Sequence, residues 1–295
     1  MLLDALKNDF GSLEHEMCAV AHLVSRGFDI ELPDIEGTGR FDILARKDGC
    51  EIEVECKSVS YDAGRKIHRS DFNALADTLC AMFKSYIDKN TQSALIVLTL
   101  KDRLTNNSQL FLRIGTHVHD AIQQRCQEIE DVDFSLQCCK YEPEILPPDA
   151  ETLWKQIEEQ IASDQFHVFV YGNSTCVVVF VARSNERDRV LSAMLKQMRK
   201  VSDQCTGLRP AIVWVKVEGI YPHEWHTLSA ESALQQMSYK YLAQPSRSHV
   251  HTVAYSSTGW LERRSSVVTN RGPVLCFSSL AHPMCDDPIL RVFGE

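Results

Sequence analysis

The chain has 295 residues, and its shares of 44% hydrophobic and 24% charged residues are typical of a globular protein and exclude a disordered or low-complexity chain. The net charge of −9, from 31 Lys and Arg against 40 Asp and Glu, argues against nucleic-acid binding through overall charge, although a local basic strip can still contact phosphates. No apolar run approaches the roughly 20 residues that span a bilayer, and the 11 cysteines form no C-x-x-C pair, so we expect reduced thiols and a cytoplasmic protein without membrane segments.

The first predicted elements are a helix and a hairpin. Between residues 2 and 26 apolar side chains recur at spacings of three and four, which places them on one helix face, and Gly27 ends this helix. A short extended piece follows. Residues 40–58 then form two strands around Asp48 and Gly49, because both residues tolerate the positive φ of a two-residue hairpin turn.

The next segment predicts a second helix and a buried strand. Residues 70–89 carry apolar side chains at helical spacing behind a capping residue, Ser70 or Asp71. Residues 94–100 are a continuous apolar run, as expected for a strand that is covered on both faces. The stretch 141–149 contains three prolines, which cannot lie inside a helix or a central strand, so we place a domain boundary there.

The second half alternates between apolar runs and helical patterns. Strands are predicted at 168–171, 177–181, 211–217, 252–255 and 274–277, and helices toward the end of 104–130 and at 150–162, 187–202 and 225–242. This pattern is typical of the α/β class. We therefore expect a first domain over residues 1–140 and a second α/β lobe over residues 150–295, which would recognise a target, form a homodimer, bind a partner protein or regulate the first domain.

The two-residue turn fixes the register of the hairpin. With Asp48 and Gly49 in the turn, Lys47 faces Cys50, and each further pair follows from this one. One face is then wholly apolar and can pack on the core; its residues are Phe41, Ile43, Ala45, Ile52, Val54 and Cys56.

The other face of the hairpin brings like charges together. Asp42 lies opposite Glu55, and Lys57 projects the same way because it follows Glu55 by two residues. Two opposed carboxylates repel each other, and a sequence optimised only for stability would avoid this pair. Mg²⁺ or Mn²⁺ between them, with the backbone carbonyl of Cys56 as a further ligand, would remove the repulsion and activate a water for hydrolysis. The alternative is a solvated strand face on which the acids pair with Lys57.

These residues resemble a known signature. Gly39-Arg40-Phe41-Asp42, twelve intervening residues and Glu55-Cys56-Lys57 are similar to the D...E-x-K motif of PD-(D/E)XK nucleases, the restriction-endonuclease-like superfamily. The predicted order of elements over residues 8–100 resembles the αβββαβ core of that superfamily, with a mixed sheet. Phe41 stands where the motif often has proline, and no Q-x-x-x-Y element follows, so the subfamily stays open.

The resemblance also implies an acid from the first helix. Glu16, with Ala19, Leu23 and Gly27 behind it, matches the spacing of that acid, and Glu14 is the less well-placed alternative. The implied catalytic residues are Asp42, Glu55, Lys57 and Glu16, and the implied metal ligands are Asp42, Glu55 and Cys56.

The expected activity is hydrolysis of phosphodiester bonds by an Mg²⁺-dependent or Mn²⁺-dependent endonuclease. The resemblance favours DNA over RNA as substrate, and restriction, repair or defence against foreign nucleic acid as the setting. A basic strip suited to phosphates consists of Arg65, Lys66, His68 and Arg69, although it could also be a solvated loop. The alternative function is a catalytically inactive module that keeps the nuclease fold for binding or regulation.

Overall fold

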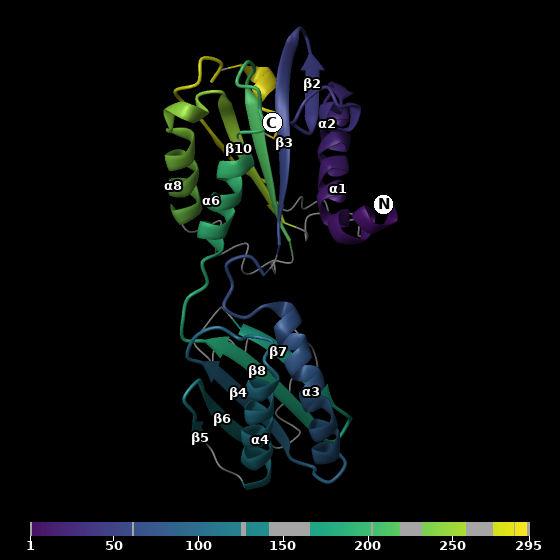
Figure 1. Cartoon of the computed structure of the whole chain (residues 1–295), viewed down its shortest axis with the longest axis vertical. Helices are drawn as coiled ribbons and strands as arrows, with labels where there is room; N and C mark the ends of the chain where they lie inside the picture. The colour runs from purple at the N-terminus through teal and green to yellow at the C-terminus, as the bar shows by residue number, and fades with distance from the viewer. Residues whose placement is uncertain are drawn as a thin grey trace. The chain divides into compact units, whose positions relative to one another are not determined.

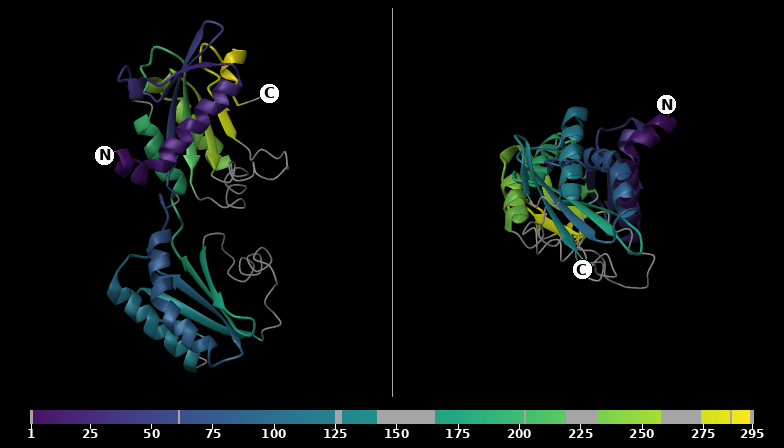
Figure 2. Two further views of the ribbon diagram at one scale, coloured as in Figure 1. Left: turned by 90° about the vertical axis from the view of Figure 1, so that its right-hand side faces the viewer. Right: turned by 90° about the horizontal axis from the view of Figure 1, so that it is seen from below.

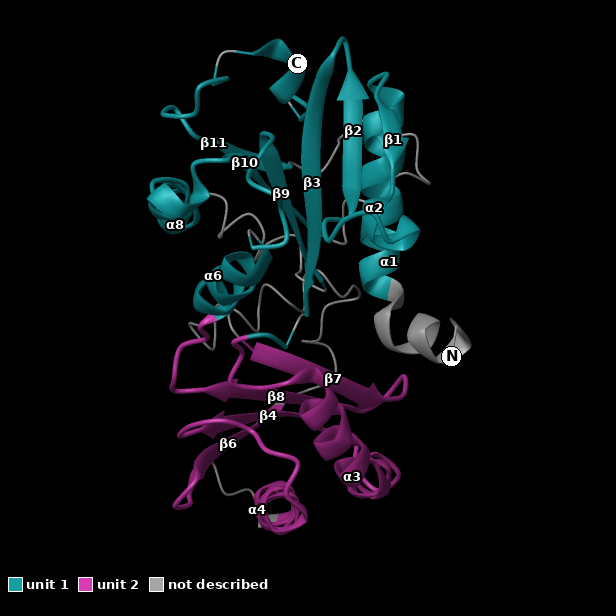
Figure 3. Ribbon diagram, turned by 45° about the horizontal axis from the view of Figure 1, so that its top comes forward, with its two compact units in different colours: residues 1–63, 190–295 teal, residues 64–189 magenta. Residues whose placement is uncertain are grey.

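The computed structural model describes residues 2–60, 62–124, 128–141, 166–201, 203–218, 232–257, 274–285 and 287–293. Within these residues the protein is an α/β structure with two mixed sheets, of six and five strands, and six α-helices. The predicted α/β class is confirmed. The chain divides into two compact units (Figure 3): unit 1 contains residues 1–63 and 190–295, and unit 2 contains residues 64–189.

The six-stranded sheet of unit 1 has the strand order β1-β2-β3-β9-β10-β11. Its strands are β1 (Asp29–Glu31), β2 (Ile43–Lys47), β3 (Cys50–Val59), β9 (Ala211–Val217), β10 (Val250–Ser257) and β11 (Leu275–Ser278). β9 pairs in parallel with both β3 and β10, and the remaining pairs are antiparallel. Parallel strands that are covered on both faces are continuously apolar, which explains the sequence AIVWVKV of β9.

Helices cover both faces of this sheet (Figure 1). α1 (Leu2–Ser25) packs on one face through Ala19 and Leu23, and it meets the apolar face of the β2–β3 hairpin there. α6 (Val190–Val201) and α8 (Ser232–Leu242) pack on the other face, against Val213 and Val215 of β9. The short elements α2 (Pro33–Glu36), η2 (Pro245–Arg247) and η4 (Pro288–Leu290) complete the described part of unit 1.

The turn between β2 and β3 has the predicted conformation. Asp48 and Gly49 both have positive φ, at 51° and 79°, as the mirror-image turn of a two-residue hairpin requires. The predicted apolar face is also confirmed, because each of its six residues is buried, with Phe41 and Cys56 at its outer end. The register of the hairpin is therefore anchored both by the turn and by the core.

Unit 2 has the strand order β5-β6-β4-β8-β7. The strands are β4 (Ser93–Leu100), β5 (Glu128–Glu130), β6 (Phe134–Tyr141), β7 (Phe166–Gly172) and β8 (Val177–Ser184), and the helices are α3 (Arg69–Ile87) and α4 (Ser108–Gln124). Both helices pack on one face of this sheet (Figure 2), around Phe83, Ile96 and Phe180. The predicted cap of α3 is wrong: the N-cap residue is His68, which makes no side-chain capping bond.

The two units differ from the predicted domains, 1–140 and 150–295. β9 and β10 belong to the second half of the sequence, yet they extend the sheet that contains β3, while α3 and β4 belong to unit 2. The reason is that hydrogen bonding between distant strands, rather than order along the chain, decides which strand lies beside β3. Of the predicted boundary, residues 142–149 lie outside the described residues, as does the predicted helix at 150–162. None of the helices that the structure describes is long and apolar enough to cross a membrane.

Candidate active site

Asp42 and Glu55 are held together by the hairpin. β2 and β3 pair in the register that the turn predicts, and Asp42 directly precedes β2. Oδ2 of Asp42 accepts a hydrogen bond of 2.6 Å from the backbone N–H of Cys56, and Glu55 accepts one from the backbone N–H of Asp42. Because each acid is tied to the backbone beside the other, their spacing is set by the fold rather than by mobile side chains.

The pKa values of both carboxyl groups are raised. Burial, and after it the negative charge of Asp42, raises the pKa of Glu55 to about 9. Burial also raises the pKa of Asp42 to about 6, although the hydrogen bond from Cys56 acts in the opposite direction. Near neutral pH the pair therefore keeps one proton, because burial and the charge of the neighbouring acid outweigh the positive charge of Lys57.

One oxygen of this pair has no partner. Glu55 is 2% exposed, and its Oε2 is a buried acceptor without a hydrogen bond. Such an atom lowers stability unless something satisfies it. A hard divalent cation fits, since Mg²⁺ takes oxygen ligands, keeps several waters and needs only one or two carboxylates. Asp42, Glu55 and the backbone carbonyl of Cys56 are the residues that could hold Mg²⁺ or Mn²⁺.

The candidate ligands are two carboxylates and one backbone carbonyl. In the part of the chain that the structure describes, no group of three or more His, Cys, Asp and Glu side chains is arranged to hold a metal ion. A structural or catalytic zinc site needs at least three protein ligands, usually with nitrogen or sulfur donors. A site built on two acids and a carbonyl is instead typical of Mg²⁺.

Lys57 supplies positive charge beside the acids. It is half-buried on β3 and projects to the same side as Glu55, two residues before it. Its charge lowers the pKa of both Asp42 and Glu55, but burial outweighs this effect at each acid. Asp34 of α2 acts against Lys57 by adding negative charge near both acids. One amine is therefore too little to neutralise the site.

Glu16 lies on α1. This helix covers the sheet face opposite to the one that carries the side chains of Glu55 and Lys57. Its neighbour His15 is buried against Trp214 on that face. Burial first, and then the charges of Asp42 and Glu16, raises the pKa of the Cys56 thiol, which points toward α1. The structure thus places Glu16 within electrostatic range of Cys56, the residue between Glu55 and Lys57.

Glu14, the alternative helix acid, is engaged elsewhere. Its carboxylate lies 2.7 Å from Nζ of Lys216, a lysine of β9 that is almost fully buried. Burial, and then the charge of Lys216, lowers the pKa of His15 to about 3, which keeps this imidazole neutral. These three residues form a polar cluster between α1 and the sheet, apart from the acid pair.

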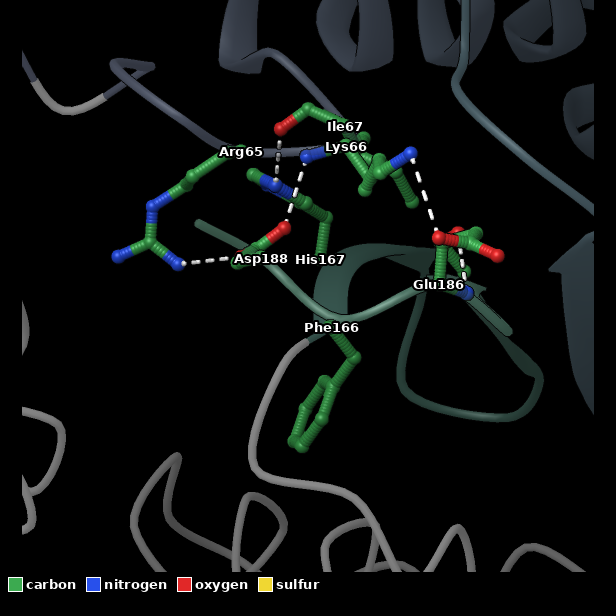
Figure 4. A pocket seen from close by; sticks show the side chains of 8 residues that line it. Arg65, Lys66, Ile67, Phe166, His167, Glu186 and Asp188 are labelled. Carbon is green, nitrogen blue, oxygen red and sulfur yellow. Dashed lines mark hydrogen bonds and ion pairs between the residues drawn. The ribbon is translucent and has the colours of Figure 1, made fainter. Parts of the chain in front are cut away.

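The predicted phosphate-binding strip forms internal ion pairs of unit 2 instead (Figure 4). Arg65 is buried, with Nη1 3.2 Å from Asp188, and the Asp188 carboxylate also accepts a 2.7 Å hydrogen bond from the backbone N–H of Lys66. Nζ of Lys66 lies 2.8 Å from Asp102 and 3.6 Å from Glu186. These cations are neutralised by acids that are distant in the sequence, so they hold unit 2 together rather than form an open phosphate surface.

The other two residues of the strip differ from each other. The His68 ring lies 2.9 Å from Nη2 of Arg103, and Arg69 is exposed at the first position of α3. Of the four residues of the predicted strip, Arg69 is the one in the exposed class.

A loop that the sequence did not predict lies beside the acid pair. Glu53 is 0% exposed, and it accepts hydrogen bonds from the backbone N–H of Thr206 at 2.7 Å and from Nη1 of Arg209 at 3.1 Å. Burial, and then the charges of Glu55, Glu53 and Asp42, raises the pKa of the Cys205 thiol. Loop 203–210 therefore approaches all three acids. No local pattern reveals this, because Thr206 and Glu53 are 153 residues apart.

Comparisons of the chain with protein-family models, with curated proteins and with solved structures found no match. Function is therefore inferred from the geometry and the electrostatics of the site.

Proposed function

We propose that unit 1 is a metal-dependent nuclease that hydrolyses phosphodiester bonds, with DNA as the substrate that the sequence resemblance favours. The observation that carries this proposal is the pair of Asp42 and Glu55, which the backbone fixes together beside Lys57 while one buried oxygen of Glu55 has no partner. A bound divalent cation would neutralise both acids and satisfy this oxygen, and two acids with a lysine beside them suit metal-dependent phosphodiester hydrolysis.

The order of elements in unit 1 supports the proposal. If residues 64–189 and the four-residue helix α2 are set aside, the chain runs through α1, β1, β2, β3, α6 and β9, which is helix, three strands, helix and strand. β3 and β9 are parallel and adjacent, and α6 is the helix between them in this order. This sequence of elements resembles the αβββαβ core of the restriction-endonuclease-like superfamily, with unit 2 inserted after the third strand.

Each site residue has a distinct proposed role. Asp42, Glu55 and the carbonyl of Cys56 would hold Mg²⁺ or Mn²⁺, and the bound ion supplies Lewis-acid stabilisation of the charge on the phosphate. Lys57 positions the attacking water, accepts its proton or offsets the charge on the scissile phosphate. Glu53 keeps loop 203–210 against the acid pair.

The direct test is cleavage by the purified full chain. Supercoiled plasmid, single-stranded DNA and RNA are incubated with Mg²⁺, with Mn²⁺ or with EDTA, and products are separated on gels. We expect metal-dependent cleavage that falls by about 100-fold or more in Lys57→Met, because general acid–base and electrostatic groups contribute this much. Asp42→Asn and Glu55→Gln should abolish it.

Matched controls separate the site from general charge effects. Glu51→Gln changes a carboxylate of the same strand that pairs with Arg46 and Arg209, and Lys84→Met changes an exposed lysine of α3; both should cleave normally. Cleavage that survives Asp42→Asn and Lys57→Met would assign the activity elsewhere. Metal binding without cleavage of any substrate would favour the alternative, an inactive module with the nuclease fold.

A further inference from the structure

The short helix α2, between β1 and β2, carries a third acid toward the acid pair. β1 and β2 are antiparallel, with Glu31 paired to Leu44, and continuing this register by two residues puts Pro33 next to Asp42. α2 begins at Pro33, and Asp34 is its second residue. The pairing of β1 with β2 therefore brings Asp34 to the same end of β2 as Asp42.

Close packing holds α2 in this place. The backbone carbonyl of Pro33 accepts hydrogen bonds from the N–H groups of Thr38 at 2.8 Å and Gly39 at 3.0 Å. Pro33 is buried, and a Cβ atom on Gly39 would lie 2.8 Å from Cβ of Pro33, which is closer than carbon atoms pack. Gly39 is three residues before Asp42, so α2 cannot move away from Asp42 without losing these contacts.

The charge of Asp34 acts on both acids of the pair. Burial is the largest cause of the raised pKa of each acid, and the negative charge of Asp34 adds to it at both Asp42 and Glu55. Asp34 is exposed, and its Oδ1 accepts a 2.7 Å hydrogen bond from the backbone N–H of Ile35. Asp34 is therefore a third carboxylate near the pair and, unlike Glu55, it is open to water.

The helix dipole does not explain this placement. An acid in the first turn is favoured by the dipole, and α2 has two, Asp34 and Glu36. The dipole gives no reason for a carboxylate close to Asp42 and Glu55. Without a cation the charge of Asp34 adds to the repulsion within the pair, whereas beside a divalent cation it is attractive. The buried Oε2 of Glu55, which has no hydrogen-bond partner, independently points to such a ligand.

We propose that Asp34 is a positioning residue of the Mg²⁺ or Mn²⁺ site, which accepts hydrogen bonds from the hydration waters of the ion. Mg²⁺ keeps several waters when one or two carboxylates bind it. Direct ligation by Asp34 is not indicated, because the described residues contain no group of three or more His, Cys, Asp and Glu side chains arranged to hold an ion. This inference rests on the proposed function, since it takes Asp42 and Glu55 as the ligands.

The test is Mn²⁺ binding by the full chain without substrate. Free Mn²⁺ is measured by electron paramagnetic resonance, at one pH, for the unaltered protein and for Asp34→Asn, Asp34→Glu and Glu36→Gln. Glu36 is the matched control, because it is another exposed acid of α2. We expect Asp34→Asn to lower the affinity by about tenfold, as groups outside the direct ligands of a metal do. Asp34→Glu should recover most of this loss, and Glu36→Gln should bind Mn²⁺ normally.

Salt separates a contact through water from a remote charge. Raising NaCl from about 0.1 M to about 1 M shortens the screening length from about 10 Å to about 3 Å. The effect of a remote charge then disappears, but a contact through one water persists. The loss of Mn²⁺ affinity in Asp34→Asn should therefore remain at the higher salt concentration.

Several results overturn the inference. They are an unchanged affinity in Asp34→Asn, an equal loss in Glu36→Gln, no recovery in Asp34→Glu, and a loss that salt removes. Asp34→Ser, with the same expected loss, replaces Asp34→Asn if that variant folds poorly. Absence of Mn²⁺ binding by the unaltered chain overturns both this inference and the proposed function. Mn²⁺ binding that Asp34→Asn weakens, without cleavage of any nucleic acid, would refute the nuclease function alone and leave the role of Asp34 standing.

Discussion

Glu55→Gln is expected to stabilise the metal-free protein at alkaline pH while it removes metal binding. The carboxyl group of Glu55 has a pKa of about 9 in the folded protein, and its ordinary value is 4.5. Between these values the folded state keeps a proton that the unfolded state has released, so the free energy of unfolding falls as the pH rises. Glutamine cannot ionise, and the variant should lose this dependence.

The size of the effect follows from the linkage between protons and folding. One proton changes the free energy of unfolding by about 1.4 kcal/mol per pH unit. From about pH 6.5 to about pH 8 the unaltered protein should therefore lose at most about 2 kcal/mol more stability than Glu55→Gln. Asp42 has a pKa of about 6, so most of its own contribution falls below this window.

Urea unfolding in EDTA at several pH values measures the difference. Trp214 lies in the core of unit 1, whereas Trp154 belongs to the residue range of unit 2. Fluorescence therefore reports both units, and hydrogen exchange of the β3 peptide shows which transition belongs to unit 1. Glu51→Gln is the control, because hydrogen bonds from Arg46 and Arg209 lower the pKa of Glu51 and leave it ionised throughout the window. If the stability curves of Glu55→Gln and the unaltered protein run parallel between about pH 6.5 and pH 8, Glu55 is not held protonated and the electrostatic basis of the ion site is removed.

Three further results are expected. Mn²⁺ affinity, measured by electron paramagnetic resonance of the free ion, should rise by up to about tenfold per pH unit between about pH 6.5 and pH 8.5, because the ion displaces the proton of Glu55; a flat profile contradicts this. Arg209→Met should lower the stability of unit 1 by about 2 kcal/mol in urea unfolding, since it leaves the buried Glu53 with fewer donors, and unchanged stability would show that the pairing is dispensable. Arg65→Met should destabilise unit 2 by about 3 kcal/mol, because it leaves Asp188 without its ion-pair partner. It should not change DNA affinity, and a weaker affinity would indicate that Arg65 contacts phosphate.

The parts of the structure that were predictable are those fixed by neighbouring residues. The turn at Asp48 and Gly49 is enough to predict the register of β2 and β3, and the register predicts that Asp42 comes to Glu55. The burial of β4 follows in the same way from its unbroken apolar run. In each case the information lies within about 20 residues of sequence.

The parts that could not be predicted depend on partners far along the chain. In the sequence Lys66 resembles a surface cation. In the structure its ammonium group pairs with Asp102, and its backbone N–H donates a hydrogen bond to Asp188. Glu53 looks like an exposed strand residue, but loop 203–210 buries it. Charge pairs between distant segments leave no periodic signal, so neither outcome could be read from spacing.

The position of unit 2 in the sequence separates two elements, β3 and α6, that are consecutive in unit 1. The two ends of unit 2 meet, because the backbone N–H of Arg189 donates a 2.7 Å hydrogen bond to the carbonyl of Gly64. A unit whose ends meet can be inserted between two consecutive elements without separating them, so β3 and α6 can remain consecutive parts of unit 1 although 126 residues, 64–189, intervene. The insertion also begins with a helix and a buried strand, α3 and β4, the same types of element that α6 and β9 provide. The sequence therefore contains two helix–strand pairs that could extend the sheet of the hairpin, α3 with β4 and α6 with β9. The pairing of β3 with β9 identifies the second pair as the one that does so.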